Sequence, residues 1–489
     1  MSAGRHRRWP CRPHASGAVA GLRRRAEQSA GGRARLRAVL ALGSVLGLDG
    51  ADKANVSTAA GSLTKAFGVG FTEIGLLVSA VALTGALCTL PVGYLTDRVR
   101  RTRLLAGSVA LWGVATFFSG LAPSYLWLLG SRAALGAVSA TAGPTVSSLV
   151  GDFFPARERA RMYGYVLGGE LIGSGLGFAV SGAVGSALGW RFAFWWPVLP
   201  TVLLVWVLAR LPEPVRGGQA RLAADSGAET AARDADPAGR AVARAGVAPD
   251  ERLVLRTDPR TLPLWRTVPY VLRIRTNLIL VVASSLGYFF FSGLRAFANL
   301  FVTRHYGVTV SVSSLLVLVL GAGALAGVLG GGRFADRLLA RGRPRARVLV
   351  ATGCLLCVPP VLAPALHLGS LPAALPLLFG GAALLGAANP PLDAARLDIV
   401  PPTLWGTAEG VRTTVRTLCE AAAPTLFGYV AAQVFTGGDR LEYTLLLFLT
   451  PLLAAGSLGA LALRTYPRDV ATADASAARL AGGGAAPVG

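Results

Sequence analysis

Nine charged residues inside long apolar stretches of the 489-residue chain have types and spacing that suit proton and ion chemistry. A charged side chain near the centre of a bilayer costs about 3 kcal/mol, so each should have a partner or face water. The four acids and five bases are Asp49, Asp52, Glu170, Glu420, Lys53, Arg132, Arg295, Arg412 and Arg416. The near balance of signs predicts that these residues pair inside a polar cavity.

The first of these stretches carries three charges that should share one helix face. Asp49 precedes Asp52 by three residues and Lys53 by four, which is the spacing of neighbours on a helix surface. If Lys53 neutralises one carboxylate, the other is left to exchange a proton. Asp49 and Asp52 are therefore proton-coupling candidates, and a structural ion pair is the alternative. Glu170, set among glycines that favour close helix packing, is the third candidate and should meet either Arg132 or a proton.

A row of charges near the end of the chain is suited to binding an anion. Arg412, Arg416 and Glu420 are four residues apart and should line one helix face. Guanidinium groups bind phosphate or carboxylate in a fork geometry, although pairing with the acids across the cavity is a competing interpretation. Candidate substrate-binding residues are Lys53, Arg132, Arg295, Arg412, Arg416 and Glu420.

The composition indicates which elements hold these residues. Hydrophobic residues make up 53% of the chain, charged residues only 15%, and the mean hydropathy is +0.53. Apolar stretches of about 20 residues can cross a bilayer as helices, so a soluble multidomain enzyme is excluded. The net charge of +23 comes from arginines between the apolar stretches. That distribution indicates membrane orientation, and we expect no nucleic-acid partner.

The pattern predicts an all-α membrane protein with twelve transmembrane helices in two six-helix, pseudo-symmetric halves. The first six spans are expected at residues 38–60, 71–96, 104–121, 124–151, 162–188 and 193–211. The other six are expected at residues 277–303, 309–334, 348–368, 372–396, 405–434 and 442–463.

Charge and composition divide the chain into five parts. Residues 1–37 form a basic cytoplasmic tail, 38–211 the first bundle and 276–465 the second bundle. Residues 212–275 contain eleven arginines and eight acids and are expected to be a largely disordered cytoplasmic linker, with a short interfacial helix at its end. Residues 466–489 are expected to be a disordered tail. Both termini should be cytoplasmic because the arginine-rich connections alternate with uncharged ones.

A motif repeats between the two predicted halves. The second span ends Gly93-Tyr94-Leu95-Thr96-Asp97-Arg98, and the eighth ends Gly332-Arg333-Phe334-Ala335-Asp336-Arg337. The two aspartates are 239 residues apart, and each lies at a similar position in its own half. Repetition of both sequence and position indicates an internal repeat of transporter type.

On these residues the chain resembles the major facilitator superfamily of secondary transporters. The resemblance implies the major facilitator fold, alternating access about a central cavity, and a conformational role for the repeated motif. The motif residues are Gly93, Asp97, Arg98, Arg101, Gly332, Asp336 and Arg337. Within the superfamily the chain is similar to Spinster-like transporters at Asp52-Lys53, Gly143-Pro144-Thr145 and Val400-Pro401-Pro402, and this similarity makes Asp52 the leading coupling candidate.

We therefore expect a proton-coupled secondary transporter, not an enzyme, in the plasma (inner) membrane. Its substrate should be a small amphipathic or anionic solute, with export favoured over import of a nutrient or organic anion. We expect a monomer without a cofactor. No metal site is expected, because the four histidines are scattered and form no ligand pattern. A non-transporting membrane sensor or an intramembrane enzyme is the remote alternative.

Overall fold

The computed structural model describes residues 33–69, 71–216, 237–308, 310–435 and 440–482, and these residues are nearly all helical. In the first half the helices follow one another with short connections. Ser124 begins one of them by accepting a hydrogen bond from the Trp127 N–H at 3.3 Å, and Gly189 ends another with φ of +99°. The helices are α2 (Arg33–Phe67), α3 (Phe71–Thr96), α4 (Arg101–Gly120), α5 (Tyr125–Ser139), α6 (Ala142–Phe153), α7 (Arg159–Leu188), α8 (Trp190–Trp195) and α9 (Val198–Ala209).

The second half repeats this arrangement after a linker that also contains helices. Its elements are α14 (Arg275–His305), α15 (Val310–Ala340), α16 (Ala346–His367), α17 (Leu371–Ile399), α18 (Trp405–Tyr429), α19 (Arg440–Phe448) and α20 (Thr450–Gly482). The linker contributes α12 (Pro237–Arg244) and α13 (Leu264–Arg273). The fold class predicted from the sequence is confirmed.

Ten segments of the described residues are long and apolar enough to cross a membrane. The first and eleventh predicted spans are not among them, but both are helices, α2 and α18, and both fit the twelve-helix pattern. Charges occupy the middle of each: Asp49, Asp52 and Lys53 in α2, and Glu409, Arg412, Arg416 and Glu420 in α18. The two least apolar spans are thus the ones that carry most of the candidate site.

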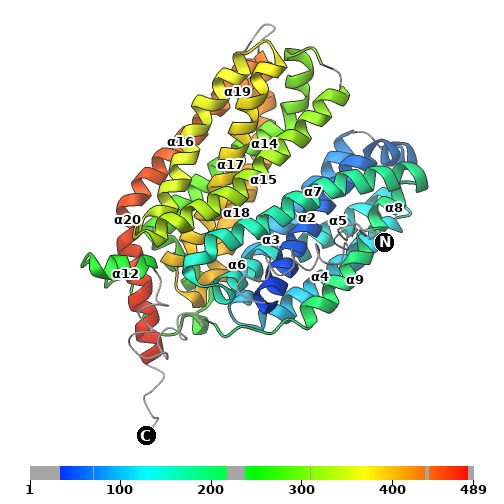
Figure 1. Ribbon diagram of the computed structural model, residues 1–489. Coiled ribbons are helices and arrows are strands. Elements are labelled where there is room, and N and C mark those ends of the chain that lie inside the picture. Colours follow the sequence, from blue (N-terminus) through cyan, green and yellow to red (C-terminus); the bar gives the residue numbers. More distant parts are fainter. Residues whose placement is uncertain (1–32, 70, 217–236, 309, 436–439, 483–489) are drawn as a thin grey trace, which may run out of the picture.

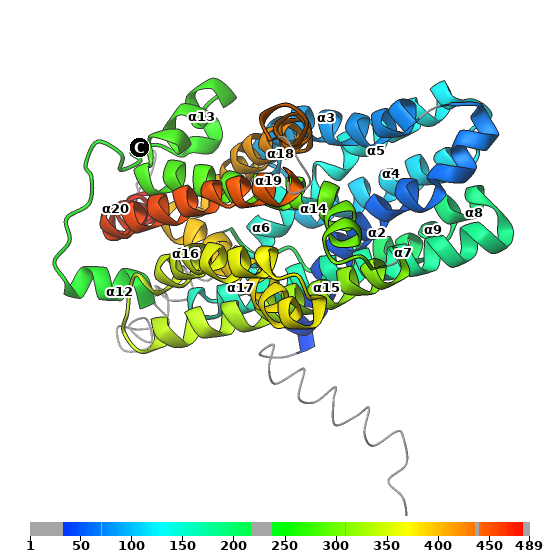
Figure 2. The same cartoon turned by 90° about the horizontal axis from the view of Figure 1, so that it is seen from above.

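The two halves share a hydrophobic core at one end and have separate cores at the other. The shared core includes Leu149 and Phe154 of the first half together with Leu404 and Trp405 of the second. Toward the opposite end, one core contains second-half residues only and two smaller cores contain first-half residues only. Figure 1 shows the halves meeting at one end and diverging toward the end that carries α8 and α19, and Figure 2 shows them side by side from above. We call the joined end the Asp97 end.

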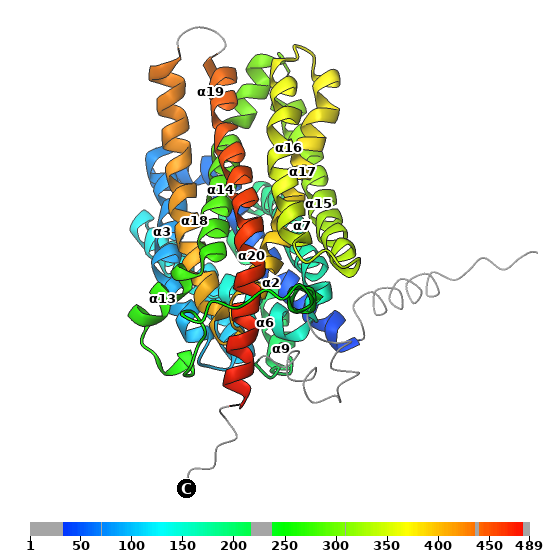
Figure 3. The ribbon, with the colours of Figure 1, turned by 90° about the vertical axis from the view of Figure 1, so that its left-hand side faces the viewer.

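The linker and the C-terminal tail differ from the expectation of disorder. Residues 237–255 fold against α20, where the Asp250 N–H donates to Thr472 at 2.8 Å and the Leu255 N–H donates to Ser476 at 3.1 Å, and α13 packs on α14 and α18. The last helix, α20, continues to Gly482, so residues 466–482 are helical (Figure 3). The sequence suggested disorder because these segments are polar and small, but they are stabilised by each other. Residues 1–32, 217–236 and 483–489 lie outside the described residues, and the predicted helix at residues 264–273 is present.

Candidate substrate-binding and proton-coupling site

Glycines place α2 directly against α7, and this contact builds one side of the site. A Cβ atom at Gly50 would lie 2.5 Å from the Glu170 carbonyl oxygen, and one at Gly173 would overlap the backbone of Gly47. Only glycine at these positions allows the two backbones to touch. The close approach brings the side chains of Lys53 and Glu170 together.

Lys53 is shared by two carboxylates. Its Nζ atom lies 2.8 Å from Asp49 Oδ2 and 3.2 Å from Glu170 Oε1. The three side chains are 47%, 27% and 33% exposed, so water and solutes can reach them. Two carboxylates around one ammonium group carry a net charge of −1, and one bound proton would neutralise the trio. Glu170 therefore meets Lys53, whereas either Arg132 or a proton was expected, and Arg132 pairs with Asp52.

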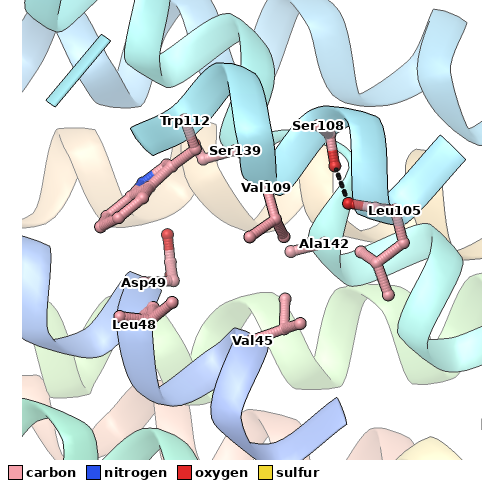
Figure 4. A pocket seen from close by; sticks show the side chains of 9 residues that line it. All are labelled: Val45, Leu48, Asp49, Leu105, Ser108, Val109, Trp112, Ser139 and Ala142. Atoms are coloured by element: carbon pink, nitrogen blue, oxygen red, sulfur yellow. Dashed lines mark hydrogen bonds between the residues drawn. The ribbon is translucent and has the colours of Figure 1, made fainter. Parts of the chain in front are cut away.

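Asp49 also borders a small pocket inside the first half. Figure 4 shows Asp49 extending from α2 toward Trp112 of α4, with Ser139 nearby. The cavity of about 20 Å³ is lined by Val45, Leu48, Leu105, Ser108, Val109 and Ala142 as well. This volume has room for about one water molecule, but nearly all of the lining is apolar, so the pocket offers few partners that would hold a water beside Asp49.

Asp52 lies in a different environment from Asp49 and Lys53, although all three were expected on one face. Its two carboxylate oxygens accept hydrogen bonds from Arg132 at 2.9 and 2.6 Å, and Asn55 donates to the same carboxylate at 3.3 Å. Asp52 is 3% exposed and Arg132 is 2% exposed. Ser181 and Trp196 extend this buried network through Asn55. The structure thus separates a buried pair, Asp52–Arg132, from the accessible trio around Lys53.

The second half contributes an accessible ion pair. Arg416 Nε lies 3.6 Å from Glu420 Oε1, and the guanidinium group sits 4.4 Å from the centre of the Tyr288 ring. Ser292 fixes α14 against α18 by donating to the Glu420 carbonyl oxygen at 2.9 Å. Arg295 is exposed on α14 and forms no ion pair with any residue that the structure describes.

The accessible groups of the two halves face each other. Arg416 is close enough to repel Lys53 and to attract Glu170 electrostatically. We call Asp49, Lys53, Glu170, Arg416 and Glu420 the central charged cluster. It carries two bases and three acids on three helices from both halves, so a solute bound there would contact both.

A buried network beside this cluster joins Arg412 to three charges that the count of nine left out, Asp393, Arg396 and Glu409. Arg396 lies 2.8 Å from Asp393 and 2.7 Å from Glu409, and Arg412 lies 3.6 Å from Asp393 and pairs with Glu409. Arg412 also donates to Ser284 of α14 at 3.3 Å. All four charged side chains are under 9% exposed, so Arg412 is held in this network, apart from Arg416. Its signal was present in the sequence, since Asp393 and Arg396 are three residues apart within a predicted span.

The repeated motif closes the Asp97 end through two symmetrical contacts. Asp97 accepts hydrogen bonds from the N–H groups of Gly406 at 2.8 Å and Thr407 at 2.7 Å, at the start of α18. Asp336 accepts one from the Arg161 N–H at 2.7 Å, at the start of α7. Each aspartate caps a helix of the opposite half, where the helix dipole favours negative charge. Burial raises the pKa of Asp97 to about 6, although the hydrogen bonds from Thr407 and Gly406 oppose this rise.

The motif arginines have separate roles. Arg98 donates to the Leu262 carbonyl oxygen of the linker at 2.6 Å, and Arg101 is buried in an ion pair with Asp152. Arg337 is exposed. Glycines of the motif allow close contact, because a Cβ atom at Gly93 would lie 2.5 Å from the Gly406 carbonyl oxygen and one at Gly332 would overlap the Ala160 backbone.

A second repeated contact was not predicted from the sequence. Arg347 binds Asp398 with Nη1–Oδ distances of 2.6 and 2.5 Å, and both side chains are fully buried. Arg101 and Asp152 form the corresponding pair in the first half, and each pair is separated by 51 residues. Arg159 of the first half reaches Asp398 at 3.6 Å. This repeated spacing was the signal available in the sequence.

Linker residues reinforce the first of these pairs. Glu213 accepts hydrogen bonds from the Thr102 N–H at 2.8 Å, the Thr102 hydroxyl at 2.7 Å and Arg101 at 3.0 Å. Partial burial opposes ionisation of Glu213, but these hydrogen bonds outweigh it and hold the pKa of its carboxyl group below the usual value. Glu213 thus caps α4 from the linker side.

Comparison with known proteins agrees with this geometry. A family model described as "Major Facilitator Superfamily" matches residues 42–424. The D-galactonate transporter of Escherichia coli O6:H1 is 29% identical over 296 residues, covering 60% of this chain and 64% of that protein. Protein spinster of Drosophila melanogaster is 28% identical over 164 residues, covering 33% of this chain and 27% of that protein. The chain therefore aligns with less than two thirds of the length of either relative.

A solved structure shares the fold. It is a bacterial homolog of the human lysosomal transporter Spinster in an inward-facing, unoccupied conformation, with a TM-score of 0.55 and 20% sequence identity. The match covers 88% of this chain and 97% of that one. Together with the Drosophila relative, it confirms the similarity to Spinster-like transporters.

Proposed function

Because the chain belongs to the Major Facilitator Superfamily, we propose that it is a proton-coupled secondary transporter of a small anionic or amphipathic solute. The observation that carries this proposal is the central charged cluster, in which Lys53 is shared by Asp49 and Glu170 and faces Arg416 and Glu420. The cluster offers two cationic side chains that can bind an anion. Its three carboxylates outnumber these cations by one, so one carboxylate is left to bind a proton.

The chemistry of the cluster couples the two ligands. The substrate anion and the carboxylates compete for Lys53 and Arg416. A proton on Asp49 or Glu170 releases Lys53 from one carboxylate, so its ammonium group becomes free to bind the anion. Proton and anion then bind together. The D-galactonate transporter among the relatives is named for a carboxylate-bearing solute, which supports an anionic substrate class.

We place the arginine-rich Asp97 end in the cytoplasm of the plasma (inner) membrane, with both termini on that side. Basic connections are retained in the cytoplasm, and at this end Arg98 and Arg100 lie between α3 and α4 while Arg101 and Arg103 lie in the first turn of α4. With that orientation the structure corresponds to an outward-facing form, closed at Asp97 and Asp336. Alternating access requires these caps to break when the opposite end closes.

Two transport directions follow from two different observations. Similarity to Spinster-like transporters favours export, in which protons enter as the solute leaves. Binding of proton and anion together favours symport, and hence import of a nutrient or organic anion. We retain export as the first proposal on the similarity to Spinster-like transporters. Proton–anion symport is the second, because Lys53 has two carboxylate partners.

The test is transport by the purified full-length protein in liposomes. Labelled D-galactonate and a labelled lysophospholipid are offered under an imposed pH gradient of either sign. Symport predicts accumulation when the outside is acidic, and antiport predicts accumulation when the inside is acidic. Movement of neither compound under either gradient contradicts the proposed substrate class.

Variants then test the site. In Glu170→Gln, gradient-driven accumulation should fall at least about tenfold, whereas exchange of labelled for unlabelled substrate should persist because exchange moves no net proton. Glu251→Gln is the matched control, since Glu251 is a carboxylate 63% exposed on the linker and far from the cluster in the fold. Undiminished gradient-driven transport by Glu170→Gln would assign Glu170 a structural role only.

A further inference from the structure

A groove at the Asp97 end lies outside the central charged cluster and combines positive charge with an apolar wall. It has a volume of about 360 Å³ and lies between the linker and the connection from α15 to α16. Figure 2 shows α12 beside the joined ends of α15 and α16. The lining residues are Val242, Ala245, Val247, Gly342, Arg343, Pro344, Arg345, Ala346, Leu349 and Pro467.

Two backbone turns shape this groove. Gly342 adopts φ of +82°, and this reverses the chain between α15 and α16. Gly246 adopts φ of +65° directly after α12, and the Val247 N–H donates to the Val242 carbonyl oxygen at 3.3 Å. The first turn presents the arginines, and the second places Val242 and Val247 opposite them.

Among the residues that the structure describes, none compensates the charge of the groove. Arg343 and Arg345 are both exposed, and neither forms an ion pair with a residue in the described part of the chain. The lining contains no acidic residue. By contrast, Arg347, two residues further on, is fully buried against Asp398. Arg343 and Arg345 are therefore available to an anion from outside the protein.

The position of the groove indicates the source of that anion. Ala346 begins a segment apolar enough to cross the membrane, and the preceding such segment ends at Ala340, so the arginines lie at the membrane surface. Leu349, one turn further into the apolar segment, is 41% exposed. A ligand that spans the groove meets arginines at one end and an apolar, membrane-facing wall at the other.

We propose that this groove binds the phosphate-bearing headgroup of an anionic phospholipid. Arg343 and Arg345 contact the phosphate, and an acyl chain runs along Leu349. Basic pockets beside transmembrane helices at the membrane surface are suited to such headgroups. A soluble phosphate compound shares the headgroup chemistry but gains nothing from Leu349. The bound lipid would hold the linker helix α12 to the connection between α15 and α16.

The experiment uses the full-length protein in phosphatidylcholine nanodiscs that contain a small fraction of photoreactive phosphatidylglycerol. Cross-linked peptides are identified by mass spectrometry. Cross-links are expected on the peptides that contain residues 242–247 and 342–349. The double variant Arg343→Gln/Arg345→Gln should lower cross-linking there roughly tenfold, because each basic residue near the surface adds to the attraction.

The matched control is Arg100→Gln/Arg103→Gln, which removes two exposed arginines, one from the corresponding connection of the first half and one from the first turn of α4. This control should leave cross-linking at residues 342–349 unchanged. Ala245→Trp supplies an independent variant, because it fills the groove without changing any charge and should also abolish the cross-links. A cooperative thermal unfolding transition, measured for each variant, checks that the variant is folded.

Three outcomes overturn the proposal. Cross-links spread evenly around the protein, or equal losses in the two arginine pairs, would mean general attraction of lipid to a basic surface. Displacement of the lipid by water-soluble glycerol 3-phosphate would mean a site for free phosphate compounds. None of these outcomes depends on whether the protein transports the proposed solute, so failure here is separate from failure of the transport proposal.

Discussion

Asp97, directly after α3, accepts a hydrogen bond from the backbone N–H of Thr407 at the start of α18, at an N–O distance of 2.7 Å. The acceptor belongs to the first half and the donor to the second. Asp336 repeats this relationship in the opposite direction with Arg161 at the start of α7. Closure of the Asp97 end therefore depends on carboxylates that cap helices across the boundary between the halves.

Replacing Asp97 with alanine should open this end. The variant leaves the N–H groups of Gly406 and Thr407 and the Thr407 hydroxyl without their acceptor, and each unsatisfied buried group costs about 1–3 kcal/mol. The ratio of closed to open molecules should fall roughly tenfold or more. Distances between spin labels at Arg100→Cys and Arg341→Cys, in a background without native cysteines, report the change. A distance distribution identical to that of the parent protein would show that closure does not rest on Asp97.

Acid should favour the closed form. Burial raises the pKa of Asp97 to about 6 in the structure, whereas an exposed aspartate has a pKa of about 3.9. The closed form thus binds a proton more tightly than a form in which Asp97 meets water. Its share should rise as the pH falls from about 6 to about 4 and stay constant at higher pH. The same spin-label distances, measured across this range, check the sign.

Asp97→Asn separates loss of charge from loss of the cap. The amide oxygen can still accept a hydrogen bond from Thr407, and the neutral side chain carries no penalty for burying charge. This variant should remain closed, in contrast to Asp97→Ala, and should lose the part of the pH dependence that comes from Asp97. The part that remains would come from Asp336, the carboxylate that caps α7 at the same end. Opening of Asp97→Asn at all pH values would argue that the negative charge itself is required.

The sequence was sufficient for the fold and for the motif because both depend on local patterns. Apolar stretches of membrane-crossing length define the helices, and Gly93 and Asp97 repeat at Gly332 and Asp336. The partners of these residues come from the other half of the chain, so a single sequence does not reveal them. Gly406 and Thr407, for example, carry no feature that marks them as donors to Asp97.

Charge pairing was the least predictable part of the site. Helical spacing placed Asp49, Asp52 and Lys53 on one face, but residues three apart differ by about 60° around a helix, which is enough to separate their environments. Asp52 turns toward Arg132 inside the first half, and Asp49 stays beside Lys53. The direction in which α2 packs on α7 and the reach of the Arg132 side chain from α5 decide this, and neither is encoded in the spacing of residues.

Asp52→Asn should destabilise the protein more than Asp49→Asn. Asp52 and Arg132 form a buried pair, and loss of one partner leaves a buried charge uncompensated at a cost of about 3–5 kcal/mol. Asp49 is 27% exposed, so water replaces it beside Lys53. Thermal unfolding in detergent should show a clearly lower midpoint for Asp52→Asn only. The double variant Asp52→Asn/Arg132→Met should recover part of the loss, and equal midpoints for the two single variants would contradict this account.

Gly173→Ala should separate α2 from α7 and disturb the central charged cluster, whereas Gly175→Ala on the same helix should not. A Cβ atom at Gly173 would overlap the backbone of Gly47, and backbone cannot move aside as a flexible side chain can, so we expect a loss of about 1–3 kcal/mol. A Cβ atom at Gly175 meets nothing within 4 Å, and alanine favours helix over glycine by about 0.5–1 kcal/mol, so that variant should be neutral or slightly more stable. Thermal unfolding compares the two stabilities.

Gradient-driven transport tests the cluster, because Lys53 reaches Glu170 across this helix contact at 3.2 Å. Equal behaviour of the two variants in both measurements would mean that the contact between Gly47 and Gly173 does not position Lys53 and Glu170.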